Sequence, residues 1–255
     1  MLELSIESML FGIYNCPVNW IVQEKGTAYH RLYYVYDGEA FYSDNHTSFP
    51  LEKYHLYLFP VNRTYNITHN PKKPFKCMFF HIATCPMILN PAVNVDTGKS
   101  PAIYHMTKTL EHILNKTDSY PDHNELLPQL LICMISLFDA EVALRFSDDK
   151  KLQMVLDHIH RYSSSRLTNE ELASIAGYDR CYFARLFRKT FNVSPQKYIE
   201  NYRFTKAGNL LLNKFSVKQV AELVGFQDEK AFSRAFKKVK GCPPSVYLKS
   251  HSLQP

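Results

Sequence analysis

No stretch of this 255-residue chain approaches eighteen consecutive apolar residues, although 45% of its residues are hydrophobic. A membrane-spanning helix needs about 20 such residues, so we expect no membrane partner. The opening residues MLELSIESMLFGIYNC also lack the basic segment of a secretory signal and carry two glutamates instead. The sequence therefore predicts a cytoplasmic protein.

Metal-binding spacing is missing as well. The six cysteines form no C-x-x-C pair and have no histidine partners at zinc spacing. A catalytic metal needs several converging ligands and an open position, yet no H-x-H pair occurs among the histidines of the first half: His30, His46, His55, His69 and His81. We expect no disulfide, no metal, no cofactor and no enzyme activity.

Charge, by contrast, is present and unevenly divided. Residues 150–255 hold 19 Lys and Arg against 8 Asp and Glu, a net charge of +11, whereas residues 1–149 hold 11 against 16, a net of −5. Such asymmetry indicates that one part of the chain meets a polyanion. We place the boundary within RFSDDKK, residues 145–151, and predict two domains, 1–148 and 149–255.

The first half reads as short strands followed by two helices. Before about residue 97, aromatic and β-branched runs alternate with turn signals, which predicts a small antiparallel barrel or sandwich. The runs are RLYYVYDG, EAFYSD, YHLYLFPV and FKCMFFHI. Residues 101–117 then show a helical stripe, made of Ile103, Met106, Leu110, Ile113 and Leu114.

A second helix is predicted at about residues 123–146. Its apolar stripe consists of Leu127, Leu130, Leu131, Met134, Leu137 and Phe138. This stripe either covers the sheet or forms a subunit contact. Because the helix at 101–117 is already available to cover the barrel, we expect the second helix to join two copies of the chain in a homodimer.

From about residue 150 the pattern is helical, and one motif occurs twice. ELASIAGYDRCYFARLFRKTF (171–191) is matched by QVAELVGFQDEKAFSRAFKKV (219–239), with an offset of 48 residues that becomes 49 after one insertion. Matching pairs include Gly177 with Gly225, Phe183 with Phe232 and Arg185 with Arg234. A plain solvated face would explain the cations but not a second copy.

Each copy has the local signals of a helix-turn-helix. A capping box starts each first helix, formed by Thr168 with Glu171 and by Ser216 with Gln219. Each first helix ends at a glycine, which tolerates a positive φ, and an aspartate then caps a second helix. These residues are Gly177, Gly225, Asp179 and Asp228. We expect Tyr178 and Phe226 to plug the core beneath each turn.

The second helix of each copy has one aromatic and one polar face. The phenylalanines at i and i+4 should face the core, and the polar face suits the DNA major groove, where arginine binds guanine O6 and N7. The predicted DNA-binding residues are Arg180, Cys181, Ala184, Arg185 and Arg188, then Glu229, Lys230, Ser233, Arg234 and Lys237.

This half of the chain resembles the DNA-binding domain of AraC-type (AraC/XylS) transcriptional regulators over about 100 residues. The resemblance is carried by the two copies of the motif, by YRFTKAGNLLL between them and by the closing G-x-x-P-x-x-Y. The resemblance implies that both second helices enter the major groove of double-stranded DNA. We also expect activation of transcription, with RNA polymerase as a partner, and repression stays open as the alternative. One departure is Phe204 after Arg203, where the family usually has a small aliphatic residue, and we expect it to affect packing only.

The helix between the copies makes a geometric prediction of its own. It should begin at Ser194-Pro195 and run to about Leu212. Its length is then about 27 Å, against about 34 Å between successive major grooves on one face of DNA. One protomer can therefore reach two neighbouring grooves.

The N-terminal half resembles the family's cupin-like effector domain more weakly, through LYYVYDGEAFY and YHLYLFPVNRTYNI. The resemblance implies a small-molecule effector, such as a sugar, and a homodimer. Aromatic faces with a few polar donors suit such a ligand. The predicted effector-binding residues are Trp20, Tyr34, Tyr36, Arg63, Tyr65 and His81.

We therefore predict a two-domain α+β chain: a cupin-like antiparallel β-barrel with a helical pair, then an all-α domain with two helix-turn-helix units. Its predicted function is that of an effector-responsive transcriptional activator. Two alternatives stay open. One is a constitutive regulator whose barrel is purely structural, and the other is a sugar-binding or enzymatic cupin with a DNA-binding appendage.

Overall fold

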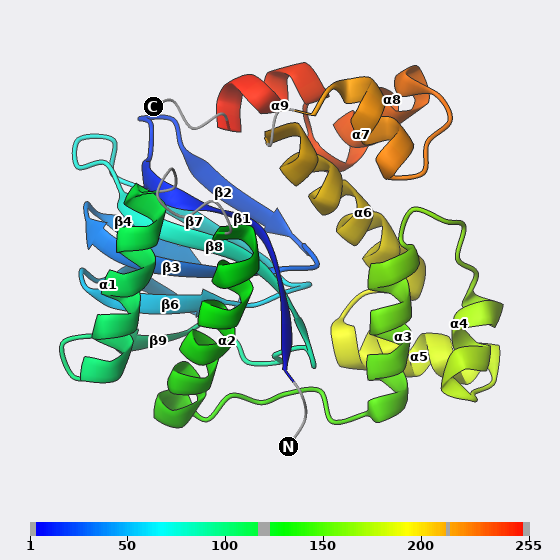
Figure 1. Ribbon diagram of the computed structural model, residues 1–255, viewed down its shortest axis with the longest axis horizontal. Helices are drawn as coiled ribbons and strands as arrows, with labels where there is room; N and C mark the ends of the chain where they lie inside the picture. The colour runs from blue at the N-terminus through cyan, green and yellow to red at the C-terminus, as the bar shows by residue number, and fades with distance from the viewer. Residues whose placement is uncertain (1–3, 117–122, 213–214, 252–255) are drawn as a thin grey trace. The chain divides into compact units, whose positions relative to one another are not determined.

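The aromatic and β-branched runs of the first hundred residues form strands in the computed structural model, which describes residues 4–116, 123–212 and 215–251 (Figure 1). The strands are β1 Ser5–Asn15, β2 Ile21–Lys25, β3 His30–Asp37, β4 Ala40–Ser43, β5 Ser48–Leu51, β6 His55–Phe59, β7 Thr64–His69, β8 Lys76–Cys85 and β9 Val93–Asp96. The four runs singled out in the sequence correspond to β3, β4, β6 and β8.

These strands pair into two antiparallel sheets. The five-stranded sheet has the order β1-β8-β3-β6-β9, and the four-stranded sheet has the order β2-β7-β4-β5. In the larger sheet β1 lies along β8, from Ser5 opposite Cys85 to Asn15 opposite Lys76. The two facing sheets form the predicted cupin-like antiparallel barrel.

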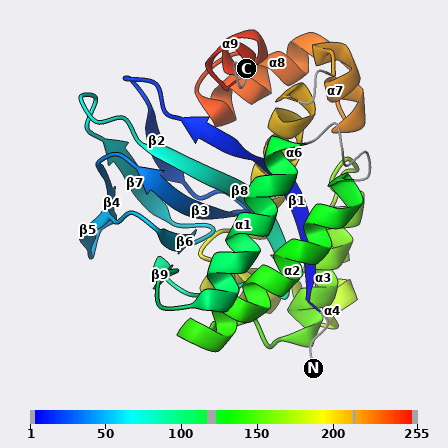
Figure 2. The same cartoon turned by 60° about the vertical axis from the view of Figure 1, so that its left-hand side comes forward.

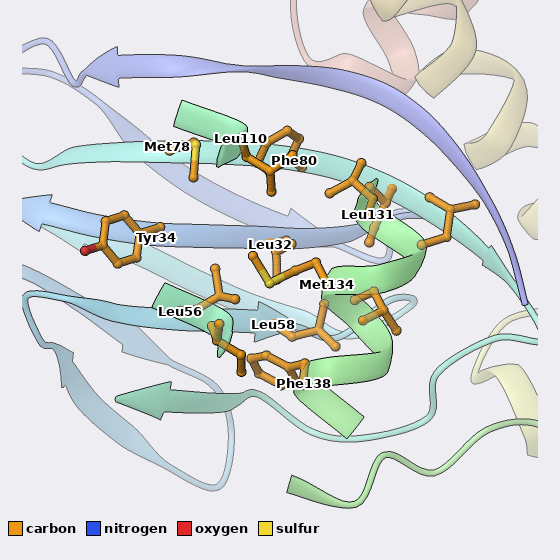
Figure 3. Close-up of a cluster of buried hydrophobic side chains, with 14 of the residues drawn as sticks. Leu32, Tyr34, Leu56, Leu58, Met78, Phe80, Leu110, Leu131, Met134 and Phe138 are labelled. Carbon is orange, nitrogen blue, oxygen red and sulfur yellow. The ribbon is translucent and has the colours of Figure 1, made fainter. Parts of the chain in front are cut away.

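The five-stranded sheet separates two hydrophobic cores. Because successive side chains of a strand point to opposite faces, Leu32 and Tyr34 of β3 pack on the helix side, while Tyr33 and Val35 face the four-stranded sheet. Figure 3 shows the helix-side core. Its labelled residues are Leu32, Tyr34, Leu56, Leu58, Met78, Phe80, Leu110, Leu131, Met134 and Phe138.

Helices α1 (Pro101–Asn115) and α2 (His123–Val142) cover the outer face of the five-stranded sheet (Figure 2). The prediction of a subunit contact is wrong for most of the α2 stripe. Leu127, Leu131, Met134 and Phe138 have no exposed surface, and Leu130 is half-buried. The apolar face of a five-stranded sheet is too wide for α1 alone, so α2 packs on it as well.

The predicted end of α2 at about residue 146 is also wrong. The helix ends at Val142, and Ala143 takes a left-handed conformation with φ of 49°. Phe146 then forms an antiparallel bridge with Ile88. The chain thus leaves the helix by adding a short extended segment beside the loop after β8, a long-range pairing that helical periodicity does not reveal.

Residues 149–255 form a second compact unit, separate from residues 1–148. Its helices are α3 Lys150–Tyr162, α4 Asn169–Ala176, α5 Arg180–Phe191, α6 Pro195–Leu212, α7 Val217–Leu223, α8 Glu229–Lys240 and α9 Pro244–His251. α6 spans the 18 residues predicted for the joining helix. Within the described ranges, no helix has both the length and the apolar character that a membrane span requires.

Phe204 has the packing role expected of it. Its side chain is 3% exposed and stacks on Phe232 at 6.2 Å between ring centroids. Phe226 and Phe236 complete this aromatic cluster beneath the second helix-turn-helix. The ring of Phe204 therefore makes more contacts in this cluster than a small aliphatic side chain would.

Candidate nucleic-acid interface and effector site

The first helix-turn-helix comprises α4 and α5, and its turn follows the predicted signals. Thr168 Oγ1 accepts from the Glu171 backbone amide at 3.2 Å, and the Glu171 carboxylate accepts from the Thr168 amide in return. Gly177 has φ of 63°, which ends α4. Asp179 caps α5 by accepting from the Cys181 amide at 2.8 Å, and the amides of α5 hold the pKa of this carboxyl below its usual value.

The second helix-turn-helix, α7 and α8, repeats this arrangement. Ser216 Oγ accepts from the Gln219 amide at 3.2 Å, and Gln219 Oε1 accepts from the Ser216 amide at 2.9 Å. Gly225 has φ of 85° after α7. Asp228 then caps α8 by accepting from the Ala231 amide at 2.8 Å. Both capping boxes and both aspartate caps are confirmed.

Both second helices bury their aromatic face, as predicted. Phe183 and Phe187 of α5 and Phe232 and Phe236 of α8 have no exposed surface. The predicted DNA-binding residues lie on the opposite sides of the two helices. Arg180, Cys181, Arg185, Arg188, Glu229, Lys230, Arg234 and Lys237 are exposed, and Ala184 and Ser233 are half-buried.

The predicted aromatic plug is present in the second unit only. Phe226 packs on Phe232 at 5.5 Å. The ring of Tyr178 instead lies half-buried at the surface, with Lys151 Nζ 4.4 Å from its centroid and Tyr182 edge-on at 5.1 Å. The prediction is therefore wrong for Tyr178, whose turn is one residue shorter and whose hydroxyl favours a position near solvent.

Arg180 differs from the other cations of the two faces because it forms an ion pair with Glu170 of α4. Within the described part of the chain, no ion pair involves Arg185, Arg188, Lys230, Arg234 or Lys237. The offsets of the repeat place Lys218 and Glu229 where the first unit has Glu170 and Arg180. The charges at this pair of positions are thus reversed between the units.

Two contacts tie the α3–α4 connection to the rest of the second unit. Arg203 of α6 donates from Nε to the Ser163 carbonyl at 2.8 Å and from a terminal nitrogen to the Ser165 carbonyl at 2.9 Å. A Cβ at Gly225 would lie 1.8 Å from the Ser164 carbonyl oxygen. The joining helix therefore hydrogen-bonds to this connection, and the turn of the second unit packs directly against it.

The structure does not bring the six predicted effector residues together. Tyr65 is buried between the sheets, with Trp20 packed at the edge of that core, and His81 is half-buried. Arg63 is exposed. Tyr34 and Tyr36 pack on the helix-covered side. Their assignment to the barrel interior is wrong, because alternation along β3 points them away from it.

A buried polar cluster that the sequence interpretation missed lies beside Tyr65. Arg31 forms an ion pair with Glu24 at 2.5 Å and donates to the hydroxyls of Tyr29 at 3.0 Å and Tyr65 at 3.3 Å. Its Nε has no hydrogen-bond partner among the described residues. An arginine within a predicted strand, two residues from Tyr33, was the available signal.

The neighbouring His30 is buried too. Its Nδ1 donates to the Phe59 carbonyl at 3.1 Å, while Nε2 lacks a partner within the described residues. Burial lowers the pKa of His30 to about 4, so the ring is neutral at physiological pH. No group of three or more His, Cys, Asp or Glu suited to a metal ion occurs in the described parts of the chain.

Comparison with known proteins identifies the family of the chain. A family model described as a helix-turn-helix domain matches residues 172–250. The chain is 34% identical over 97 residues to the Transposon Tn10 TetD protein of Escherichia coli, a match that covers 38% of this chain and 70% of TetD. The chain belongs to the AraC-type family of transcriptional regulators.

Two further relatives of this AraC-type protein are named as regulators. It is 36% identical over 91 residues to the HTH-type transcriptional regulator YobQ of Bacillus subtilis, covering 35% of this chain and 38% of YobQ. It is 28% identical over 127 residues to the raffinose operon transcriptional regulatory protein RafR of Pediococcus pentosaceus, covering 49% of this chain and 46% of RafR. The chain thus spans less than half the length of either relative.

The fold of the AraC-type chain is found in a solved structure. A crystal structure of ToxT from Vibrio cholerae strain SCE256 with an unsaturated fatty acid bound matches 94% of this chain and 95% of that chain, with a TM-score of 0.67 and 14% identity. This likeness confirms the predicted fold, an antiparallel β-domain followed by a helical domain with two helix-turn-helix units.

Proposed function

We propose that this AraC-type protein binds double-stranded DNA sequence-specifically and regulates transcription. The observation that carries the proposal is the pair of outward polar faces on α5 and α8. They stand at equivalent positions of two helix-turn-helix units, and buried phenylalanines hold them outward. The joining helix α6 keeps both units within one compact body of 107 residues, Asp149–Pro255.

Within these faces, Arg185 and Arg234 are the principal base readers of the proposal. Each lies directly opposite the buried phenylalanines of its helix, is exposed and takes part in no ion pair in the described part of the chain. Their guanidinium groups are free to donate two hydrogen bonds to one guanine. Cys181 and Ala184 in the first unit offer apolar contacts, which suit a thymine methyl group, whereas Lys230 and Ser233 in the second offer hydrogen-bond donors.

Selection from a random duplex library tests the proposal. The full chain should enrich a motif with two elements separated by about one turn, roughly 10 base pairs. The fragment 149–255 should enrich the same elements, because both faces lie in it. Failure of the full chain to prefer any sequence over random DNA would remove specific regulation from the proposal.

An effector bound in the barrel is supported by the buried Arg31 cluster. Arg31 Nε and His30 Nε2 are buried polar atoms without partners in the described residues, and such atoms usually find a ligand or water. RafR is named for a raffinose operon, and the ToxT structure holds an unsaturated fatty acid. A polar small molecule such as a sugar, placed between the aromatic rings and the Arg31 cluster, fits the hydroxyls of Tyr29 and Tyr65.

Fluorescence of Trp20, the single tryptophan, provides the binding assay because this ring packs on Phe75 at the edge of the barrel core. Raffinose, arabinose and an unsaturated fatty acid are the probes. Tyr65→Phe should weaken binding of the active probe, whereas Tyr34→Phe, on the helix-covered side, should not. If none of these compounds changes the fluorescence or the melting temperature, the purely structural barrel becomes the better account.

Dimerisation, contact with RNA polymerase and activation are further parts of this proposal, and the resemblance to the AraC-type family supports them. The buried α2 stripe does not provide the dimer contact. The outer sides of α1 and α2 border a groove of about 580 Å³. Its lining is His105, Lys108, Thr109, His112, Ile113, Leu126 and Leu130. Leu130→Glu should lower the sedimenting mass of the folded chain if two copies meet there, and an unchanged dimer mass would place the contact elsewhere.

A further inference from the structure

The first helix-turn-helix carries an aromatic and cationic cluster that the second lacks. Tyr178 and Tyr182 contact each other edge-on at 5.1 Å, and Lys151 Nζ lies 4.4 Å from the centroid of the Tyr178 ring. In the second unit the half-buried Phe226 packs against the core phenylalanines Phe204 and Phe232, and Ala231 stands at the position of Tyr182. The framework of the fold therefore does not require this cluster.

The cluster is accessible and continuous with the DNA-facing side of α5. Tyr182 is 47% exposed and precedes Arg185 by three residues, so the two side chains lie on adjacent parts of the helix surface. Lys151, at the start of α3, is exposed as well. A row of Lys151, Tyr178, Tyr182 and Arg185 thus extends one flank of the recognition face.

The nearby carboxylates in the described residues hydrogen-bond to helix N-termini and do not form an ion pair with Lys151. Asp149 accepts from the backbone amides of Lys151 and Leu152 at 3.0 and 3.1 Å, and Asp179 accepts from those at the start of α5. Both carboxylates are thereby committed to helix N-termini. Lys151 forms no ion pair in the described residues and rests on an aromatic face, which attracts a cation without neutralising it.

We propose that Lys151 and Tyr182 bind the sugar-phosphate backbone of duplex DNA beside the first recognition helix, with Tyr178 positioning the lysine. The ammonium group would bind a phosphate oxygen, and the Tyr182 hydroxyl would donate to the same strand. Such contacts fix the register of a recognition helix without reading bases. This inference rests on the proposed DNA-binding function and adds a one-sided anchor to it.

The salt dependence of binding to a mixed-sequence duplex of about 30 base pairs tests the anchor, because phosphate contacts do not require an operator. Lys151→Ala in the full chain should weaken binding roughly fivefold to tenfold near 0.1 M salt and reduce the slope of log affinity against log salt by about 0.9. Lys150→Ala, the adjacent exposed lysine of the same helical turn, is the matched control and should leave the slope unchanged.

The tyrosines have separate tests. Tyr182→Phe should weaken binding less than Lys151→Ala, with an unchanged slope, because it removes a donor but no charge. Tyr178→Leu should lower DNA affinity when Lys151 is present but should have no further effect in a chain that already carries Lys151→Ala. Tyr178→Phe should keep wild-type affinity, because its ring still holds the lysine. If Tyr178 only stabilises the fold, Tyr178→Leu should lower DNA affinity by the same factor with and without Lys151→Ala.

The outcomes separate the anchor from the function on which it rests. If the wild-type chain shows no salt-dependent binding to duplex DNA, the proposed function fails. If the wild type binds and Lys151→Ala keeps the slope of Lys150→Ala, the anchor is wrong while DNA binding stands. Melting temperatures equal to that of the wild type would confirm that each variant is folded.

Discussion

The two helix-turn-helix units have the same framework and different surfaces. A capping box, a left-handed glycine, an aspartate cap and two buried phenylalanines recur in both. Several positions outside the core differ: Cys181 corresponds to Lys230, Tyr182 to Ala231 and Ala184 to Ser233. Two pairs of basic residues are both exposed and identical, Arg185 with Arg234 and Lys189 with Lys238, and of these the arginines lie directly opposite the buried phenylalanines.

This difference separates what folding requires from what recognition uses. Unpaired amides at helix starts, positive φ and a buried aromatic core constrain both copies in the same way. Exposed side chains contribute little to stability, so they are free to differ between units that read different bases. A residue that is exposed and yet the same in both copies is therefore the best candidate for a shared contact with DNA.

The glycines test how strictly the framework is held, and they give the largest expected effect. Gly225→Ala should destabilise the second unit by about 3 kcal/mol, because it adds a left-handed alanine and a Cβ that would lie 1.8 Å from the Ser164 carbonyl oxygen. Gly177→Ala should cost only about 1–2 kcal/mol, since just the flexible end of Lys151 lies nearby. Urea unfolding followed by circular dichroism measures both.

Gly241→Ala is the control for these two variants. Gly241 has φ of 80°, and no atom of the described residues lies within 4 Å of its added Cβ, so its substitution reports backbone strain alone. Trp20 fluorescence should follow the barrel unit without change in all three variants. If Gly225→Ala and Gly241→Ala lower the unfolding free energy equally, the close approach of Gly225 to Ser164 adds nothing to the cost of the alanine.

The framework was predictable because its signals are local. Capping boxes, glycine exits and phenylalanines at i and i+4 can be recognised within a dozen residues, and the structure confirms each of them. The α2 stripe was misassigned because helical periodicity shows only that a face is apolar. Whether Met134 meets a sheet or a second subunit depends on the width of that sheet, which is a long-range property.

The barrel interior was harder to predict for a related reason. β3 is buried on both faces, so Tyr33 and Tyr34 show no alternation of apolar and polar residues from which to choose the inner face. The Arg31 cluster joins Glu24 of β2, Tyr65 of β7 and β3 itself. Strand pairing that brings such distant residues together leaves no fixed spacing in the sequence.

The identical arginines sharpen the comparison at the next level of effect. Arg185→Ala and Arg234→Ala should each weaken binding to the selected duplex by about 1–3 kcal/mol and relax preference at one base pair, because a bidentate bond to guanine is lost. Competition among single-base operator variants measures the preference. Lys238→Ala, near the end of α8, should instead weaken all sequences alike and lower the salt slope by about one.

Unequal arginine results would break the symmetry between the units. If Arg234→Ala removes discrimination while Arg185→Ala keeps it, the second unit alone reads bases and Arg185 leaves the set of reader residues. The first unit would then contribute affinity without sequence preference.

The capping boxes give a smaller effect that should be the same in both units. Thr168→Ala and Ser216→Ala each remove a side-chain acceptor from an exposed helix start and should cost about 1 kcal/mol of unfolding free energy. Substitution by glycine should cost less than half as much. Circular dichroism during urea unfolding detects the loss, and an alanine effect below the error of that measurement at one site would show that its box is dispensable.

The ion pair of Glu170 and Arg180 gives the smallest expected effect on stability. Breaking it tests whether Glu170 keeps Arg180 from contacting DNA. Glu170 and Arg180 are about 60% exposed, so breaking their ion pair by Glu170→Gln should change stability by less than about 1 kcal/mol. The same substitution releases Arg180 and removes a negative charge near the DNA, so affinity for duplex DNA should rise by up to about tenfold at low salt. Lys218→Gln, the equivalent change in the second unit, removes a positive charge and should lower affinity. If Glu170→Gln leaves affinity unchanged while Lys218→Gln reduces it, Arg180 lies outside the DNA contact and the first unit relies on its other cations, such as Arg185, Arg188 and the proposed anchor Lys151.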